Sequence, residues 1–448
     1  MIGNPKVSRT QPDRRSFRQG LVPISLSGWT APEPPPSHYP QLQQDIDTDV
    51  IIIGAGLAGS SLALHLTEQG VDTVILEARQ PGWGASGRNA GHVLPVLKDL
   101  RAFNRFPDQG KAFLDIFREH RAIPFDLSHQ HGIDCDAMQS GYLNAATSKI
   151  AYERFKAGAV WLEDRELEEI DTLGTAQMQE TTGSRHFTHG VVYKSGGRIN
   201  PYLFTNGLLA AAVRMGAVVH GDSEAIALSR STNRWRVRTS GGNVNGRRVV
   251  FCTNAYPGNI VPAFTKGFYP LTAYGVATEP LPKELADLIM PSGMTLAEVP
   301  IDLNPLVKDR HGRLVLSSIP AFARADDAAW HFANHLRWIH KLWPHSRDAD
   351  IRLGHYWTGR VAMRKREFPG VFELQPGVFG LMYFNAWGNV MAPLLGKLFA
   401  HALARDEMDK LPFPIEKPEP VAMQRQREIL IGNLLIPAAR TARKIGLL

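Results

Sequence analysis

The sequence contains few cysteines and no long apolar run. Cys135 and Cys252 are the two cysteines among 448 residues, which excludes a disulfide-stapled fold and a cysteine-rich zinc or iron–sulfur site. No apolar stretch reaches the length that a transmembrane helix needs. Hydrophobic residues make up 44% and charged residues 21% of the chain, which excludes a largely disordered protein. The length favours two domains.

Positive charge is concentrated at the two ends of the chain. The formal net charge is +7, of which residues 1–46 carry +2 and residues 411–448 carry +3. The nearly neutral body argues against a nucleic-acid partner, which would require a basic stripe. Arg14 and Arg15 resemble a twin-arginine export signal, but the apolar stretch behind them is short and ends in prolines. We expect a cytoplasmic protein, with export or membrane-peripheral placement as alternatives.

The C-terminal tail, residues 411–448, has four prolines within its first ten residues and then an apolar and basic pattern. Residues 423–435 show apolar side chains at helical spacing, and Arg440, Arg443 and Lys444 follow. A basic helix of this kind can pack on its own body, pack on a second subunit in a homodimer, or lie on an anionic membrane surface. We expect packing, with membrane-surface contact as the alternative.

A strand, a glycine-rich turn, a helix and a second strand follow one another between residues 49 and 77. Residue 49 is an aspartate, and residues 50–53 are all apolar and β-branched. Residues 54–59 match G-x-G-x-x-G. The three glycines permit a tight turn, a close approach of the backbone to a pyrophosphate, and close helix–strand packing. The helix N-terminus offers N–H groups to the phosphates, and an acid ends the second strand to accept ribose hydroxyls. This unit predicts dinucleotide binding by Gly54, Ala55, Gly56, Leu57, Ala58, Gly59 and Glu77.

Further motifs distinguish FAD from NAD. Residues 82–92 read G-W-G-A-S-G-R-N-A-G-H, residues 196–201 read G-G-R-I-N-P, residues 253–256 read T-N-A-Y, and residues 357–359 read W-T-G. Together they resemble the D-amino-acid-oxidase-like FAD superfamily, and most of all its γ-glutamylputrescine oxidase branch, over roughly residues 47–400. The chain departs from the family pattern at Ala90, His92 and Cys252, and it reads Gly388-Asn389-Val390 where relatives often have G-H-G.

The resemblance implies an α/β fold, α+β overall, in which a Rossmann-like FAD-binding domain of the glutathione-reductase type is interleaved with an antiparallel-sheet substrate domain. We expect the FAD-binding domain at 47–95, 196–257 and 351–410, the substrate domain at 96–195 and 258–350, and an N-terminal arm at 1–46. Beyond the glycine turn, the implied FAD contacts are Ala78, Arg79, Gly84, Ala85, Ser86, Arg88, Asn89, Ala90, Gly91, Ala225, Thr253, Asn254, Ala255, Gly359, Gly388, Asn389 and Val390. Some relatives attach FAD through a cysteine in the W-x-G region; because neither cysteine lies near it in sequence, we expect non-covalent FAD.

The resemblance also implies the chemistry. An amine or amino acid would lie against the flavin and pass a hydride to N5, giving an imine that hydrolyses, with O2 as the expected electron acceptor. The candidate pocket residues are His92, Tyr274, Tyr356, Trp357, Arg360 and Trp387. Aromatic walls suit an alkyl amine and a guanidinium suits a carboxylate, although each aromatic side chain could equally belong to the core. The sequence shows no metal-ligand spacing, so we expect no metal.

Two alternatives keep the flavin but change its use. Some relatives place an oxygen-activating lysine near position 274, and no lysine occurs between Lys266 and Lys283. This gap, with the basic tail, motivates a membrane-associated dehydrogenase that passes electrons to quinone or a carrier. The other alternative is a flavin-binding subunit that turns over only with a partner. Residues 364–366 read Arg-Lys-Arg where the nearest branch has T-R-D-R, which indicates a different substrate or a solvated loop.

Overall fold

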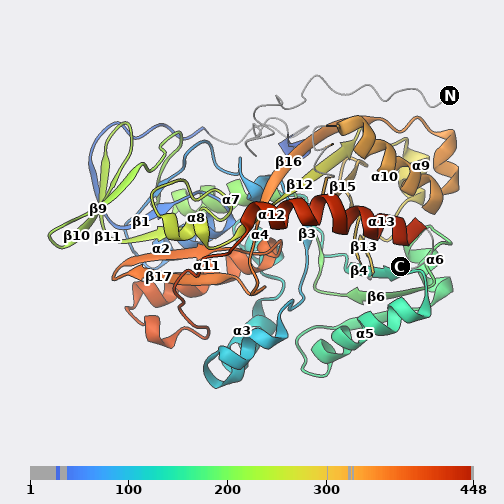
Figure 1. Cartoon of the computed structure of the whole chain (residues 1–448), viewed down its shortest axis with the longest axis horizontal. Coiled ribbons are helices and arrows are strands. Elements are labelled where there is room, and N and C mark those ends of the chain that lie inside the picture. Colours follow the sequence, from blue (N-terminus) through green and yellow to red (C-terminus); the bar gives the residue numbers. More distant parts are fainter. Residues whose placement is uncertain (1–26, 31–37, 300, 321–323, 325–326, 445–448) are drawn as a thin grey trace.

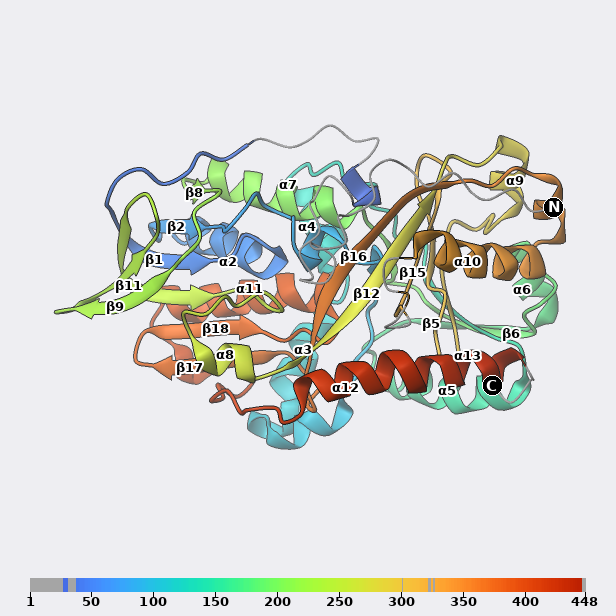
Figure 2. The same cartoon turned by 45° about the horizontal axis from the view of Figure 1, so that its top comes forward.

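Two eight-stranded sheets organise the chain, one with a parallel core and the other mainly antiparallel (Figures 1 and 2). The computed structural model describes residues 27–30, 38–299, 301–320, 324 and 327–444. The Arg14-Arg15 pair of the export-like motif lies outside the described residues. The expected architecture, a Rossmann-like part combined with an antiparallel sheet, is confirmed.

The first sheet has the strand order β17-β18-β11-β1-β2-β8. Its strands are β1 (Ile46–Ile53), β2 (Thr73–Leu76), β8 (Val218–His220), β11 (Asn243–Phe251), β17 (Gly370–Gln375) and β18 (Val378–Met382). β1 pairs parallel with β2 and β11, and β11 pairs parallel with β18. β9 (Ala227–Ser231) and β10 (Arg234–Arg238) extend β11 as an antiparallel meander. The last four residues of β1 are buried and apolar, as expected for a parallel strand covered on both faces.

Three helices pack together against this sheet: α2 (Leu57–Glu68), α7 (Pro201–Arg214) and α11 (Gly388–Ala404). α2 lies between the other two. Asn200 caps α7 by accepting hydrogen bonds from the backbone N–H groups of Tyr202 and Leu203, both at 3.1 Å, and a proline occupies the first helical position. The G-G-R-I-N-P motif is therefore the start signal of α7.

The second sheet has the strand order β16-β12-β15-β14-β13-β4-β6-β5. The strands are β4 (Tyr142–Ala146), β5 (Ile170–Leu173), β6 (His189–Tyr193), β12 (Tyr269–Thr278), β13 (Thr295–Glu298), β14 (Leu306–Lys308), β15 (Leu314–Ser318) and β16 (Leu353–Met363). Helix α10 (Ala328–Leu342) packs on one face beside β12, β15 and β16, and α5 (Lys149–Glu163) packs on the other face at the β4–β6 end. β12 lies second from the edge of the sheet.

The pairing of β16 divides the segment 351–410, which was expected to belong entirely to the FAD-binding domain. β16 pairs antiparallel with β12 from Leu353 to Met363, so this strand belongs to the second sheet. β17, β18 and α11 belong to the first sheet and its helices. The chain thus crosses between the two parts at residues 364–369, immediately after β16.

The C-terminal tail packs on the body of its own chain. α12 (Gln424–Leu430), a π-helical turn η9 (Ile431–Leu435) and α13 (Ile436–Lys444) follow one another as the red helix that crosses the antiparallel part (Figure 2). Glu428 accepts a hydrogen bond from the Thr272 hydroxyl of β12 at 2.9 Å, and the Arg440 guanidinium donates to the Ser318 hydroxyl at 3.0 Å. Packing on the body, one of the two forms expected, is what the tail shows.

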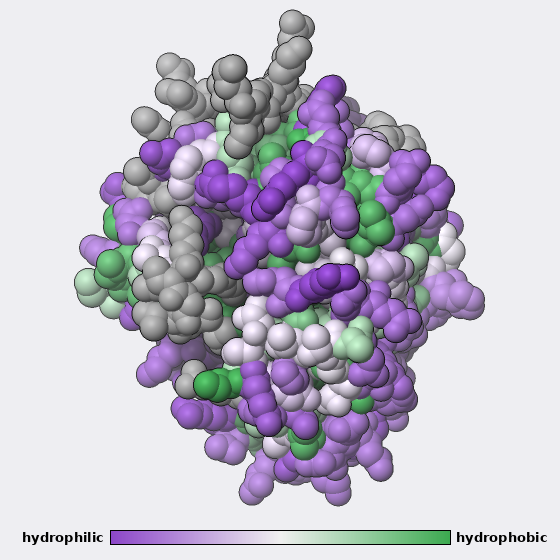
Figure 3. Space-filling model, turned by 90° about the vertical axis from the view of Figure 1, so that its right-hand side faces the viewer, coloured by the Kyte–Doolittle hydropathy of each residue, from purple (hydrophilic) through white to green (hydrophobic). Residues whose placement is uncertain are grey.

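The surface of the antiparallel end is mostly hydrophilic, with separate small hydrophobic groups (Figure 3). Four hydrophobic side chains of the tail stay exposed: Met423, Leu430, Leu434 and Leu435. Within the described part of the chain, no helix combines the length and the hydropathy needed to cross a bilayer.

Candidate functional site

The glycine turn after β1 has the geometry that its motif predicts. Gly54 adopts φ +104°, a conformation that other residues rarely adopt. A Cβ atom on Gly59 would lie 2.0 Å from the Gly54 carbonyl oxygen, and one on Gly56 would lie 2.8 Å from the Ser86 Oγ. Ala55, Leu57 and Ala58 are buried beneath the turn. The backbone at Gly54–Gly59 is therefore tight, with its N–H groups at the start of α2.

The Glu77 carboxylate lies beside this turn, at the end of β2. Its Oε2 accepts a hydrogen bond from the Ala55 N–H at 2.8 Å, and its Oε1 accepts from the Arg79 N–H at 3.1 Å and the Trp83 indole at 2.5 Å. Burial raises the pKa of Glu77, while these hydrogen bonds oppose the shift. The position of the carboxylate is thus fixed from three directions. Trp83 was not among the predicted site residues.

A groove runs along the carboxyl ends of β1, β2 and β11, where ligands bind in doubly wound folds. Ten predicted cofactor residues line it: Gly54, Gly56, Glu77, Ala78, Gly84, Ala85, Ser86, Ala225, Thr253 and Asn254. Asn254 holds the groove wall together, because its Oδ1 accepts a hydrogen bond from the Tyr383 N–H at 2.9 Å. Cys252 also lines the groove, but burial raises the pKa of its thiol well above the ordinary value. Ala255 is buried behind the groove in the core of the first sheet.

Hydrogen bonds fix the loop that carries Ser86 to Gly91. The Ser86 Oγ accepts a hydrogen bond from the Leu57 N–H at 2.9 Å, so this hydroxyl stands at the N-terminus of α2. Asn89 donates to the Ser86 carbonyl at 3.0 Å and accepts from the Gly91 N–H at 2.9 Å. Arg88 is buried and donates to the Thr358 carbonyl at 3.3 Å. Together, these hydrogen bonds hold the loop, which includes Ala90, between the glycine turn and β16. At β16, Gly359 packs against the Arg88 side chain.

The start of α11 meets the same loop. The Asn389 amide donates to the Asn89 Oδ1 at 3.0 Å and to the His92 carbonyl at 2.8 Å. A Cβ atom on Gly388 would meet nothing within 4 Å, so there is open space at this helix N-terminus. Val390 is buried behind it. The positive end of the helix dipole therefore faces open space beside the loop.

Several buried polar atoms in this region have no hydrogen-bond partner within the described structure. They are Nδ1 and Nε2 of His92, Nε1 of Trp387 and Oδ1 of Asn389. An unpaired buried polar group costs about 1–3 kcal/mol, so such a cluster indicates a polar ligand that supplies partners. Burial lowers the pKa of His92 to about 3, which keeps its ring neutral. The groove fits the dinucleotide end of FAD, and the region with the unpaired polar atoms fits its flavin end.

The strand register separates the six candidate pocket residues. Tyr274 pairs with Thr358 across the β12–β16 ladder, and its hydroxyl lies 2.9 Å from the His335 Nε2 of α10. The Tyr356 ring stacks on Tyr274 at 5.6 Å, so both tyrosines face α10. Trp357 points to the opposite face, because successive residues of a strand alternate, and its indole donates to the Arg88 carbonyl at 2.9 Å.

Arg360 shares the face of its pairing partner, Thr272, whose hydroxyl bonds to the tail. The structure therefore brings Trp357 and His92 to the loop at residues 88–92, and Trp387 comes two residues before Asn389, whose amide bonds to that loop. It places the other three candidates on the α10 and tail side of the sheet. No group of three or more side chains suited to a metal ion occurs among the described residues.

Trp29 is a site neighbour that the sequence prediction missed. It lies in a short 3-10 helix, η2 (Gly28–Thr30), and is fully buried. Its indole donates to the Asn89 carbonyl at 2.8 Å, and a Cβ atom on Gly91 would lie 2.8 Å from its ring. The one sequence feature that could have indicated its role is a lone tryptophan in a proline-rich arm. Residues 27–30 of that arm thus belong to the core around the loop.

The comparisons with known proteins agree with this geometry. The chain is 25% identical over 373 residues to the γ-glutamylputrescine oxidoreductase of Escherichia coli (strain K12), across 82% of this chain and 86% of that protein. It is 27% identical over 403 residues to a probable oxidoreductase OrdL of Rhizobium meliloti (strain 1021), across 85% and 89%. The glycine oxidase of Geobacillus kaustophilus shares the fold with a TM-score of 0.67 at 19% identity, across 83% and 99% of the two chains.

The family comparison covers most of the chain. The model of the FAD dependent oxidoreductase family, named DAO, matches residues 49–402. This range contains the glycine turn and nearly all of the two sheets and of α11. It confirms the family resemblance and the FAD cofactor expected from the sequence motifs. The chain belongs to the FAD dependent oxidoreductase family.

Proposed function

We propose that this protein oxidises a carbon–nitrogen bond of an amine or amino acid, with FAD held non-covalently in the groove. The observation that carries the proposal is the cluster of unpaired buried polar atoms on His92, Trp387 and Asn389, at the end of a dinucleotide groove in an FAD dependent oxidoreductase. Two proteins similar to this chain are named for an amine and for an amino acid, γ-glutamylputrescine and glycine. That agreement supports a C–N substrate.

Different groove residues would bind different parts of FAD. The turn Gly54–Gly59 and Ser86 would hold the pyrophosphate, Glu77 the ribose, and Ala225 the adenine. Arg79, Thr253 and Asn254 would complete the wall, and Ala255 would support it from behind. The loop residues Arg88, Asn89, Ala90 and Gly91, with Gly359, Gly388, Asn389 and Val390, would surround the ring system. FAD supplies the chemistry by accepting a hydride from the substrate carbon.

Neither cysteine suits a covalent link to FAD. The Cys135 Sγ lies 3.3 Å from the Ser128 hydroxyl inside the core, and burial raises the pKa of its thiol to about 11. Cys252 is buried as well, and burial raises its pKa further. A buried thiol with a raised pKa stays protonated and unreactive at neutral pH. Non-covalent FAD is therefore part of the proposal.

Three side chains would contact the substrate: His92, Trp357 and Trp387. Because burial keeps His92 neutral, its ring can accept a hydrogen bond from an amine without placing a second positive charge beside it. Trp387 would offer its indole N–H, which has no partner among the described residues. The Trp357 ring, which packs with Trp29, would form an apolar wall. Tyr274, Tyr356 and Arg360 would act from behind the sheet, as supports of β12 and β16.

The test is reduction of the bound flavin. The purified protein, freed of oxygen, is mixed with a panel of secondary amines, amino acids and polyamine conjugates while its visible spectrum is followed. At least one compound should bleach the flavin. If none does while dithionite still bleaches it, the proposal is overturned.

The electron acceptor is the second part of the test. We propose O2, so that admitting air after reduction yields one peroxide per substrate oxidised. The alternative is a dehydrogenase that delivers electrons to quinone at a membrane surface, and the exposed Met423, Leu430, Leu434 and Leu435 of the tail favour it. Rapid reduction of a quinone analogue with little peroxide would select that alternative.

A further inference from the structure

A second cleft, of about 850 Å³, lies beside the crossover that follows β16. Three separate segments form its walls: 98–105, 364–367 and 416–427. Tyr269 and Phe372 add two aromatic rings to its lining. None of its lining residues belongs to the lining of the FAD groove. We call it the basic cleft.

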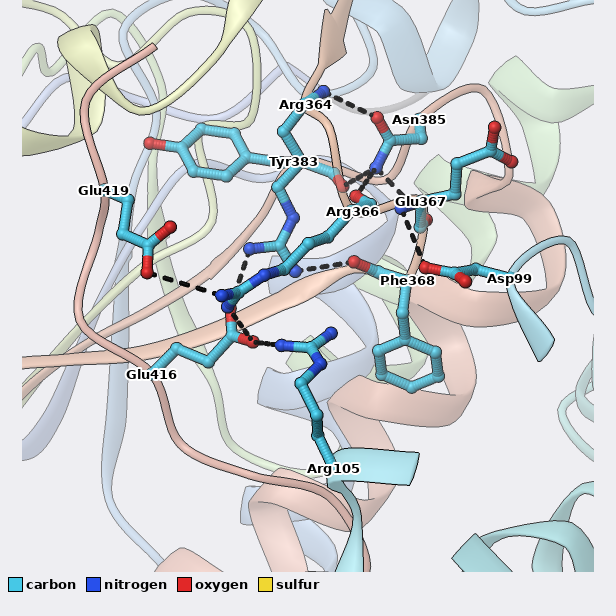
Figure 4. A network of polar contacts seen from close by, with 10 residues as sticks. All are labelled: Asp99, Arg105, Arg364, Arg366, Glu367, Phe368, Tyr383, Asn385, Glu416 and Glu419. Carbon is cyan, nitrogen blue, oxygen red and sulfur yellow. Dashed lines mark hydrogen bonds and ion pairs between the residues drawn. The ribbon is translucent and has the colours of Figure 1, made fainter. Parts of the chain in front are cut away.

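Two of the acidic side chains of the basic cleft, Glu416 and Glu419, are paired with arginines. Glu416 of the tail accepts hydrogen bonds from Arg105 at 2.9 Å, Arg364 at 2.8 Å and Arg366 at 3.0 Å (Figure 4). Glu419 accepts a fourth, from Arg366 at 3.4 Å. Three guanidinium groups around one carboxylate leave an excess of positive charge even where the ion pairs form.

Five further cations line the basic cleft without a carboxylate partner among the described residues: Lys98, Arg101, Lys365, Lys417 and Arg427. In all, eight basic and four acidic side chains line it. The Arg427 guanidinium lies over the Tyr269 ring at 5.6 Å, which holds it at the wall. The cleft therefore concentrates positive potential inside a concave, partly desolvated space, where an anion is attracted more strongly than on an open surface.

Lys98 is the cation with the most restricted position. Its ammonium donates to the carbonyls of Asn385 at 3.3 Å and Ala386 at 3.2 Å, in the turn just before Trp387 and α11. Burial lowers the pKa of Lys98, and the charge of Glu367 opposes this shift. Glu367 offsets the cost of burying this ammonium only in part, because among the described residues no carboxylate lies within ion-pair distance of it. A bound anion would lower the remaining cost.

We propose that the basic cleft binds a small molecule carrying two or more acidic groups, carboxylates or phosphates, with Lys98 at its inner end and Arg101, Lys365, Lys417 and Arg427 around it. A volume of about 850 Å³ is in the range of small-molecule sites. The cations also surround a hollow instead of covering a flat face, which favours a small ligand over a macromolecule. Through Lys98, such a ligand reaches the turn at Asn385 and Ala386.

Calorimetric titration of the full-length, FAD-loaded protein tests this site without any turnover. The probes are pyrophosphate for the phosphate class and citrate for the carboxylate class, each compared with sodium chloride of equal ionic strength. At least one probe should bind saturably at one site per chain, and the probe that binds names the class. The Lys98→Met variant should weaken that binding at least tenfold. Lys149→Met, at an exposed lysine of α5 outside the basic cleft, should leave it unchanged.

A second variant keeps the test decisive if Lys98→Met fails to fold. Arg101→Glu combined with Lys365→Glu reverses two exposed charges that hold no carboxylate, so the fold should survive and binding should again weaken at least tenfold. The proposal is overturned if neither probe gives heat beyond the salt control, or if the charge-reversed protein binds as tightly as the parent. Binding to anionic lipid vesicles with no binding of either probe would also overturn it.

Discussion

The Trp357 indole of β16 donates a hydrogen bond to the Arg88 carbonyl at 2.9 Å, and this contact joins the antiparallel sheet to the loop that leaves the glycine turn. Two glycines make room for the indole. A Cβ atom on Gly275 would lie 2.4 Å from it, and one on Gly28 would lie 2.5 Å from it. The W-x-G motif therefore works as a docking point between the two parts of the chain.

Replacing Trp357 by Phe should weaken this docking. The Phe ring retains most of the apolar contact, but the buried Arg88 carbonyl loses its partner, which costs about 1–3 kcal/mol of unfolding free energy. The loop that surrounds the flavin should loosen, so we also expect at least a tenfold loss of FAD affinity.

Trp343→Phe is the matched control, since the Trp343 indole also donates to a buried carbonyl, that of Thr182, at 2.8 Å. Chemical denaturation should show a similar loss of stability in both variants, whereas FAD titration should show a loss in the first alone. Equal FAD affinity in the two variants would contradict the docking role.

Gly59→Ala should disrupt the turn, because its Cβ would lie 2.0 Å from the Gly54 carbonyl oxygen and the backbone must move. We expect a destabilisation of about 3 kcal/mol and loss of FAD from the purified protein. Gly158→Ala is the control: it also lies within a helix, α5, but its Cβ would meet nothing within 4 Å. There the better helix propensity of alanine should stabilise the protein by up to about 1 kcal/mol. Thermal unfolding and the ratio of flavin to protein absorbance measure both effects.

The parts of the site that the sequence predicted are those that depend on local structure. The β1–α2–β2 unit at residues 46–76 follows from a short strand, a glycine turn and a helix, each of which has its own signal. The place of this unit within a two-sheet architecture was predicted from the family resemblance. The motifs also named Asn89 and Asn389, which meet although 300 residues separate them.

What the sequence did not predict depends on register and long-range packing. Tyr274 and Trp357 were assigned to one pocket, but the register of β12 against β16 turns them to opposite faces. A shift of one residue exchanges the two faces of a strand, and a single sequence does not fix it. Trp29 and Lys98 were missed for the same reason, since each has its polar contacts with segments at least 60 residues away.

Glu77→Gln should weaken FAD binding and the fold together. The carboxylate accepts hydrogen bonds at both oxygens, from the Ala55 N–H on one side and from Arg79 and Trp83 on the other. An amide has one acceptor oxygen, so its NH2 group must face a donor, which costs about 1–3 kcal/mol. Glu224→Gln changes an exposed acid that lines the same groove and should alter neither property. If the two variants release FAD equally, the role of Glu77 is refuted.

His92→Phe should change how stability depends on pH. Burial lowers the pKa of His92 from 6.5 to about 3, so the unfolded chain takes up a proton below pH 6.5 that the folded chain excludes. The contribution of neutral His92 is therefore complete above pH 6.5 and declines as the pH falls toward 3, by up to about 1.4 kcal/mol per pH unit. Removing the imidazole removes that decline, so urea titrations between about pH 4.5 and 7 should give a shallower slope for the variant.

The comparison with the parent protein isolates His92. His331 and His335 are also buried, with pKa values lowered to about 4 and about 3, but they contribute equally to both slopes. Parallel curves for the parent and the His92 variant would show that the His92 ring reaches solvent, and the neutral hydrogen-bond acceptor assigned to the substrate site would then be lost.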